Sequence, residues 1–455
     1  MTIVNIVNIV FMKTHLVQSS GCRAQGAGCT VQDSEFKVQS KNTFCLIVYS
    51  LLISLISIPV TSQSLKKISQ EELRDKISGY WIGQCVGNYM GFPFEGTYLE
   101  DPVPVFVDRY YQFDDDTSLA INRNDLRGYC LLMTNWLEGA FSDDDTDIEF
   151  VTLHAVEKYG LDINYSEITE MWKKHINRKI WCANRTARDL MSEGLIAPAT
   201  GGKTNNENWY QIDPQLVNEI WSMFYPGMLR KSAERAEWGA RITSDDWGTH
   251  PTIAYGVIYS AAAFEKDVNK LVDLALKNIP ENSPFNEGIK DVIVWHKQNA
   301  DWRKTRKLIF DKYYRYKSGG YEAPVSDVSS LTNGLFGIMA ILYGGGDFVK
   351  TTGIAVTAGL DCDNQAATCA GLIGVIKGGS AIPARLTLGL SDKPSWKVPF
   401  NDTYINYTRD DLPPFTKISD IVNRILVIAE EAIIANGGKK VTQNNKVYYL
   451  INSEL

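Results

Sequence analysis

Four glycines recur at intervals of four residues in one segment, and this pattern limits how the segment can pack. Gly79, Gly83, Gly87 and Gly91 follow a capping-box sequence at residues 69–72 (SQEE), which predicts a helix that begins there. A period of four places the glycines on one helical face. Each glycine costs roughly 1 kcal/mol of helix stability relative to alanine. The stripe therefore predicts close approach of another helix, or of a ligand, to this face.

Helical periodicity continues through most of the chain beyond this segment. The composition, with 44% hydrophobic and 22% charged residues, is typical of a globular protein. Apolar spacing predicts helices over residues 69–89, 117–138, 147–158, 166–177, 183–193, 214–223, 227–242, 251–264, 268–276, 287–298, 329–343, 348–358, 364–376 and 418–434. Residues 447–451 predict a short strand, and no strand–helix–strand rhythm is evident. The pattern therefore predicts an all-α fold.

An uncharged apolar run lies near the beginning of the chain. Lys37 and Lys41 precede this run, residues 44–60, and small residues follow it up to Ser62. This layout predicts a secretory signal cleaved after Ser62, and hence an exported protein. The alternatives are a membrane anchor formed by residues 44–60 and a buried helix. We divide the chain into an N-terminal extension (1–62), a main domain (63–400) and a C-terminal helix and tail that pack on it (401–455).

Two clusters of aspartates stand directly before predicted helices. The first is residues 114–117 (DDDT), and the second is residues 361–364 (DCDN). Aspartate is a good N-cap, and negative charge is favourable at a helix start, so doubled capping is one interpretation. Adjacent carboxylates repel one another, however, whereas a hard cation such as Mg²⁺ or Mn²⁺ reverses that penalty. The clusters indicate either doubled capping or a site that holds two metal ions.

The sequence around these clusters resembles the ADP-ribosylglycohydrolase family. The family pattern is roughly G-D-x-x-G-x-P-x-E, then T-D-D-T, then G-x-D-x-D-T before a helix of small residues. The corresponding segments here are residues 87–95 (GNYMGFPFE), 114–117 (DDDT) and 359–364 (GLDCDN), in that order. The chain departs from the pattern at three positions, where Asn88 replaces Asp and both Asp114 and Asn364 replace Thr.

The resemblance implies an all-α domain with two metal ions, Mg²⁺ or alternatively Mn²⁺, at the bottom of a cleft. It places the metal ligands at Asp114, Asp115, Asp116, Asp361, Asp363 and Asn364. It assigns the catalytic positions to Glu95, Asp115 and Asp363. Glu95 is expected to act as a base or to position the reacting water.

Three residues are expected to bind the substrate. Asn88 belongs to the first motif, and Trp247 and His250 lie in a polar loop that often lines the cleft in family members. Trp247 would stack on a base or sugar, and His250 would contact a phosphate. The alternatives are a tryptophan packed in the core and a histidine that caps a helix.

The implied reaction is hydrolysis of an N- or O-glycosidic bond to ribose, in a small-molecule or ADP-ribosylated substrate, by a monomer. Two alternatives remain open: an exported hydrolase of glycosides or nucleosides on the same scaffold, and a non-catalytic binding or structural protein. The net charge of −7 argues against a nucleic-acid partner, which usually requires a basic surface. A membrane is expected as a partner only if the apolar run is an uncleaved anchor.

Overall fold

Two long helices, α3 (Gln70–Gly91) and α15 (Cys362–Lys377), pack against each other at the centre of the computed structural model. The structure describes residues 65–111, 138–388 and 396–453. A methyl group added at any glycine of the stripe would collide with α15 or its immediate flank, from Gly374 near one end to Asp363 at the other. The stripe is thus explained by close helix packing, which places the end of α3 beside the beginning of α15.

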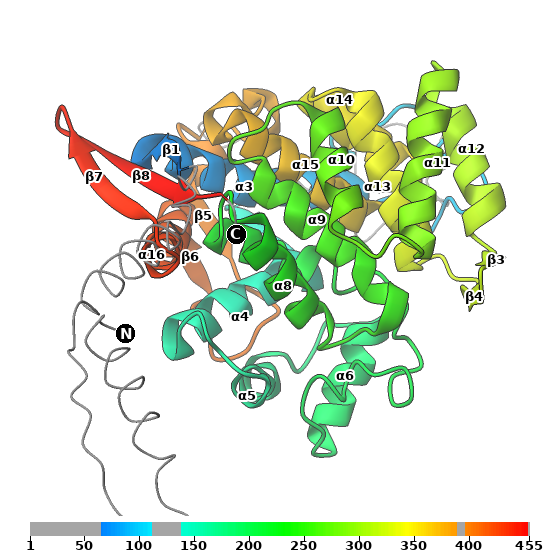
Figure 1. Ribbon diagram of the computed structural model, residues 1–455, viewed down its shortest axis with the longest axis horizontal. Coiled ribbons are helices and arrows are strands. Elements are labelled where there is room, and N and C mark those ends of the chain that lie inside the picture. Colours follow the sequence, from blue (N-terminus) through cyan, green and yellow to red (C-terminus); the bar gives the residue numbers. More distant parts are fainter. Residues whose placement is uncertain (1–64, 112–137, 389–395, 454–455) are drawn as a thin grey trace, which may run out of the picture. The chain divides into compact units, whose positions relative to one another are not determined.

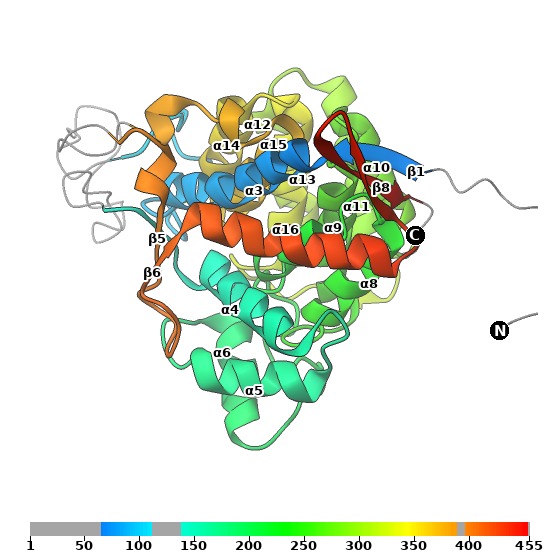
Figure 2. The same ribbon diagram turned by 90° about the vertical axis from the view of Figure 1, so that its left-hand side faces the viewer.

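The remaining helices surround this pair (Figure 1). In chain order they are α4 (Asp144–Tyr159), α5 (Tyr165–His175), α6 (Cys182–Ser192), α7 (Ile220–Phe224), α8 (Leu229–Ala240), α9 (His250–Ala261), α10 (Val268–Lys277), α11 (Pro284–Gln298), α12 (Trp302–Tyr313), α13 (Ser330–Gly344), α14 (Phe348–Thr357) and α16 (Ile418–Ala435). Figure 2 shows α16 between α3 and α4, and it packs on both. The fold is mostly helical, as predicted.

Short strands tie distant parts of the chain together. β1 (Leu65–Ser69), β8 (Lys446–Asn452) and β7 (Lys439–Gln443) form an antiparallel sheet in the order β1-β8-β7. A second sheet has the order β2-β5-β6, with β2 (Ala140–Phe141) parallel to β5 (Thr403–Ile405) and β5 antiparallel to β6 (Phe415–Lys417). A small hairpin joins β3 (Lys317–Ser318) to β4 (Tyr321–Glu322). The described residues all belong to one compact unit.

Most predicted elements are present, and the differences are local. The strand predicted over 447–451 is β8, whereas α12 was not predicted. The helix predicted over 214–223 divides into a 3₁₀ turn (Leu216–Asn218) and α7. The predicted helix at 117–138 falls almost entirely outside the described residues, as does the apolar run at 44–60. In the described part of the chain, no helix combines the length and apolarity needed to cross a bilayer.

Candidate metal centre

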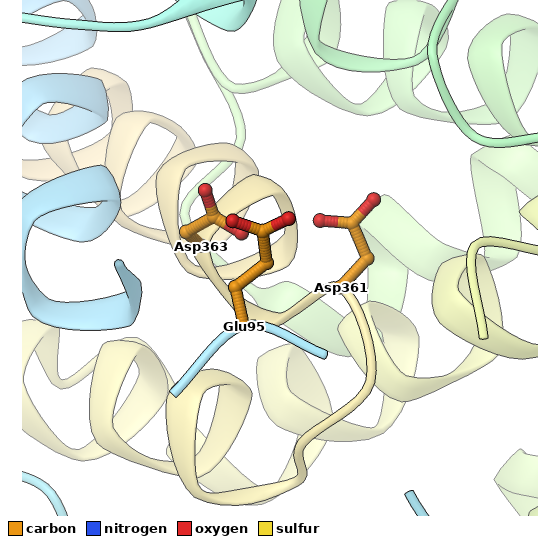
Figure 3. Close-up of side chains that lie close together, drawn as sticks. All are labelled: Glu95, Asp361 and Asp363. Carbon is orange, nitrogen blue, oxygen red and sulfur yellow. The ribbon is translucent and has the colours of Figure 1, made fainter. Parts of the chain in front are cut away.

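Three carboxylates converge where α3 ends and α15 begins. Glu95 lies in the turn that follows α3, Asp361 directly precedes α15, and Asp363 is in its first turn. One oxygen from each lies within 4.8 Å of the other two, and Figure 3 shows the three side chains turned toward one another. Glu95 and Asp361 are partly exposed, whereas Asp363 is buried. Such a set of oxygens suits a hard cation at a place that solvent can reach.

A second group of carboxylates shares Asp363 with the first. Asp143 precedes α4 and Asp145 is in its first turn, and oxygens of these two residues and of Asp363 lie within 4.8 Å of one another. The two groups therefore meet at Asp363. This arrangement brings three segments, distant in the sequence, to one acidic centre.

Close backbone contacts position the first group. Gly91 packs directly on the backbone of Asp363. Leu360 forms two backbone hydrogen bonds with the segment that follows Glu95. Gly96 N donates to Leu360 O, and Leu360 N donates to Tyr98 O, both at 2.9 Å. Leu360 has a φ of 61°, which turns the chain sharply before Asp361. Helix packing and this turn thus place Glu95 opposite both aspartates.

Two asparagines position the second group. Asn88 is buried on α3. Its Nδ2 donates to Asp143 Oδ1 at 3.4 Å and to Asp145 Oδ2 at 3.3 Å. Its Oδ1 accepts from Ser142 Oγ at 3.2 Å. Asn364 Nδ2 donates to Asp145 Oδ1 at 3.1 Å. An aspartate at position 88 would lack the donor that reaches both carboxylates.

Crowding of like charges dominates the electrostatics of this centre. Burial raises the pKa of Asp145 well above its usual range, and the neighbouring Asp143, Asp144 and Asp363 raise it further. Burial and Asp363 likewise raise the pKa of Asp361 well above its usual range. A divalent cation would reverse this penalty by stabilising the charged carboxylates.

Asp143 caps α4, because its Oδ1 accepts from Asp145 N at 3.4 Å. At the start of α15, two observations test whether the residues fit a metal ion better than helix capping. Asp361 stands at the N-cap position of α15, yet in the described structure its side chain makes no capping hydrogen bond. The Oδ1 of Asn364 is buried and has no hydrogen-bond donor among the described residues. The first observation removes the capping explanation for Asp361, and the second leaves an amide oxygen in need of a partner. The donor set, carboxylates and one amide oxygen, matches the preference of Mg²⁺ or Mn²⁺.

The structure places the other predicted residues as follows. Trp247 is buried and packs on Trp209, with ring centroids 5.0 Å apart, as the core interpretation expected. His250 begins α9, and its Nδ1 is buried without a hydrogen-bond partner among the described residues. Burial lowers the pKa of His250. The predicted ligands at 114–116, including the catalytic assignment of Asp115, lie outside the described residues and stay a prediction.

Sequence reasoning did not select Asp143 or Asp145. The signal was present, because the Asp-Asp-Asp-Thr pattern of residues 114–117 recurs at residues 143–146. Both copies precede a predicted helix, so local sequence does not show which copy meets Asp363. The contacts of Asn88 and Asn364 with Asp145 supply that information, and they depend on tertiary packing.

Comparison with known proteins identifies the family of the chain. The family model for ADP-ribosylglycohydrolase matches residues 69–417, which include both carboxylate groups. The chain belongs to the ADP-ribosylglycohydrolase family. Among solved structures, one described as an ADP-ribosylglycohydrolase-related protein complex is similar at 16% sequence identity and a TM-score of 0.48, and the match covers 80% of this chain and 99% of that chain. No curated protein matches the chain.

Proposed function

We propose that this chain is a metal-dependent hydrolase that cleaves an N- or O-glycosidic bond to ribose in an ADP-ribosyl substrate. The observation that carries the proposal is the position of Asp363 in both carboxylate groups. A carboxylate that belongs to two possible cation sites is an arrangement suited to a two-metal hydrolase. Membership in the ADP-ribosylglycohydrolase family supports the class of reaction.

Each residue has a distinct role in this proposal. Asp143 and Asp145 would hold one Mg²⁺, Asp361 would hold the other with Glu95 facing it, and Asp363 would serve both. When bound, the ions orient ribose hydroxyls and lower the pKa of a water molecule. Glu95 is partly exposed, so it is suited to position that water and to accept its proton.

The carboxylates also suit the charge that develops during bond cleavage. Departure of the leaving group places positive charge on the ribose ring. Oriented carboxylates near the anomeric carbon stabilise this charge, and their effect is larger in a partly buried site than in water. The partly exposed carboxylates of the two groups are those of Glu95, Asp361 and Asp143.

Hydrolysis assays with matched variants test the proposal. The full chain, with Mg²⁺ or Mn²⁺, is incubated with ADP-ribosyl-arginine, ADP-ribosyl-serine and a panel of nucleosides. Asp363→Asn should reduce turnover at least about 100-fold. The control is Asp347→Asn, an exposed aspartate whose Oδ1 caps α14 by accepting from Lys350 N at 2.8 Å, and it should retain activity.

The substrate panel separates the alternatives. Turnover of ADP-ribosyl compounds that EDTA abolishes supports the proposal. Turnover restricted to nucleosides would favour a different substrate on the same scaffold. Metal binding without turnover of any substrate would favour a non-catalytic binding protein.

A further inference from the structure

Asp147 links the second carboxylate group to a segment near the C-terminus. It lies on α4 two residues after Asp145, and its side chain is fully buried. The hydroxyl of Tyr404 donates to Asp147 Oδ1, and Arg409 Nε lies 3.9 Å from Asp147 Oδ2. The Arg409 side chain is also fully buried. The first turn of α4 is therefore attached, through one carboxylate, to a buried tyrosine and a buried arginine.

The guanidinium of Arg409 is fixed from several sides. Its Nη1 donates to Arg178 O at 3.1 Å and its Nη2 donates to Lys179 O at 2.7 Å. Its backbone is held by Asn406, which accepts from Arg409 N at 2.9 Å and donates to Arg409 O at 3.0 Å. With both ends held, Arg409 keeps its Nε 3.9 Å from Asp147 Oδ2, an ion-pair contact without a hydrogen bond between these two atoms.

The same C-terminal segment also sets the path of the chain into α4. β5 pairs in parallel with β2, so that Tyr404 stands opposite Ala140 and Ile405 stands opposite Phe141. Ser142 and Asp143 follow β2 directly. Residues 142–145, here called the acidic turn, lie between these two restraints. Strand pairing holds the turn before it begins, and the contacts of Asp147 hold it after it ends.

We propose that Arg409 and Tyr404 are positioning residues of the metal centre, which act through Asp147 to hold Asp143 and Asp145 in the arrangement that binds a divalent cation. The binding of a cation is inferred from the function proposed above, whereas the restraint on the acidic turn is independent of that function. Removing Arg409 would leave the buried carboxyl group of Asp147 without its positively charged neighbour. Loss of Arg409 therefore favours a rearrangement of Asp147, and with it the first turn of α4.

The contacts at the other end of α4 offer a matched control. Arg424, from α16, donates from Nε to Glu157 Oε1 and from Nη2 to Glu157 Oε2, both at 2.6 Å. Arg409→Gln and Arg424→Gln remove the same charge and each break an arginine–carboxylate contact with α4. The milder variant Tyr404→Phe removes one hydroxyl, and its control is Tyr449→Phe, which loses a hydroxyl bonded to Glu430 Oε2 at 2.7 Å.

Two measurements on the full chain test the proposal. Calorimetry with Mn²⁺ measures the affinity, and hydrogen–deuterium exchange measures protection of the amides at 140–147. Arg409→Gln should weaken Mn²⁺ binding roughly 10- to 100-fold, the range typical of residues that orient metal ligands. Tyr404→Phe should act in the same direction, and both variants should speed exchange at 140–147 more than their controls do.

A double-mutant cycle asks whether Arg409 acts through Asp147. If it does, Arg409→Gln adds little to the loss of affinity that Asp147→Asn already causes. Equal effects of Arg409→Gln and Arg424→Gln on both affinity and exchange would overturn the proposal, as would full additivity in the cycle. If the parent protein binds no Mn²⁺, the proposed function fails, and the exchange measurement alone decides the positioning role. If Arg409→Gln does not fold, the comparison of Tyr404→Phe with Tyr449→Phe decides.

Discussion

Asn364 Nδ2 donates to Asp145 Oδ1 at 3.1 Å, and this bond joins the first turn of α15 to the first turn of α4. Asn364 directly follows Asp363, the residue that belongs to both carboxylate groups. The family resemblance expects Thr at position 364. The single hydroxyl oxygen of a threonine would have to serve both as the donor to Asp145 and as a metal ligand. An asparagine can donate to Asp145 and still turn an oxygen to a ligand.

Replacing Asn364 with alanine should therefore weaken divalent-cation binding. The variant loses the donor to Asp145 and an amide oxygen at the centre, so we expect Mg²⁺ affinity to fall roughly 10- to 100-fold in calorimetry. Asn278→Ala removes a surface amide that donates to Leu274 O and serves as the control. Unchanged affinity in Asn364→Ala would show that this side chain does not support the metal centre.

The affinity for Mg²⁺ should rise with pH. Burial and neighbouring carboxylates raise the pKa values of Asp145 and Asp361 well above the usual range of aspartate. A carboxyl group must lose its proton before it can bind the ion. Protons therefore compete with the metal at low pH, and each displaced proton changes the affinity by up to about tenfold per pH unit. Calorimetry at a series of pH values checks this, and a flat profile would contradict it.

The glycine stripe yields a prediction about stability. A methyl group at Gly87 would collide with the backbone of Ala366 and Ala367, which cannot move aside as a flexible side chain can. We expect Gly87→Ala to destabilise the fold by about 1–3 kcal/mol or more, although alanine is the better helix former. Gly202→Ala is the control, because its nearest contact would be at 3.5 Å. Urea denaturation measures both, and equal stability of the two variants would refute the packing argument.

Sequence patterns with a local physical cause were predictable. The stripe that ends at Gly91 indicated a closely packed face, and α15 covers that face. The family pattern pointed to Glu95, Asp361 and Asp363, and the structure brings these three residues together. Each of these features depends on spacing within one short segment.

Features that depend on distant contacts were not predictable in the same way. Asp143 and Asp145 belong to one of two equivalent Asp-Asp-Asp-Thr segments, and only tertiary packing shows that this copy reaches Asp363. β1 gains its partner, β8, from the other end of the chain. Helix α12 was not predicted because basic residues interrupt its apolar face. One of these residues, Arg306, is buried, and it donates to the carbonyl oxygens of Ala358 and Leu99.

A buried glutamate outside the metal centre predicts how stability depends on pH. Glu149 is fully buried on α4, where it accepts hydrogen bonds from the Tyr80 hydroxyl and, at 2.8 Å, from Ile220 N. Burial raises the pKa of Glu149 to about 8. The folded protein therefore keeps a proton that the unfolded chain releases at a pKa of about 4.3. The stabilisation is complete at low pH and is lost as the pH rises through about 8.

Glu149→Gln should remove this dependence because glutamine keeps the size of the side chain without its titration. The free energy of unfolding of the variant, relative to the parent, should improve by roughly 3 kcal/mol between pH 5 and pH 8. Denaturant unfolding at both pH values measures the difference, and the exposed Glu193→Gln corrects for the change in net charge. A difference that stays constant with pH would mean that Glu149 does not hold its proton in the folded protein.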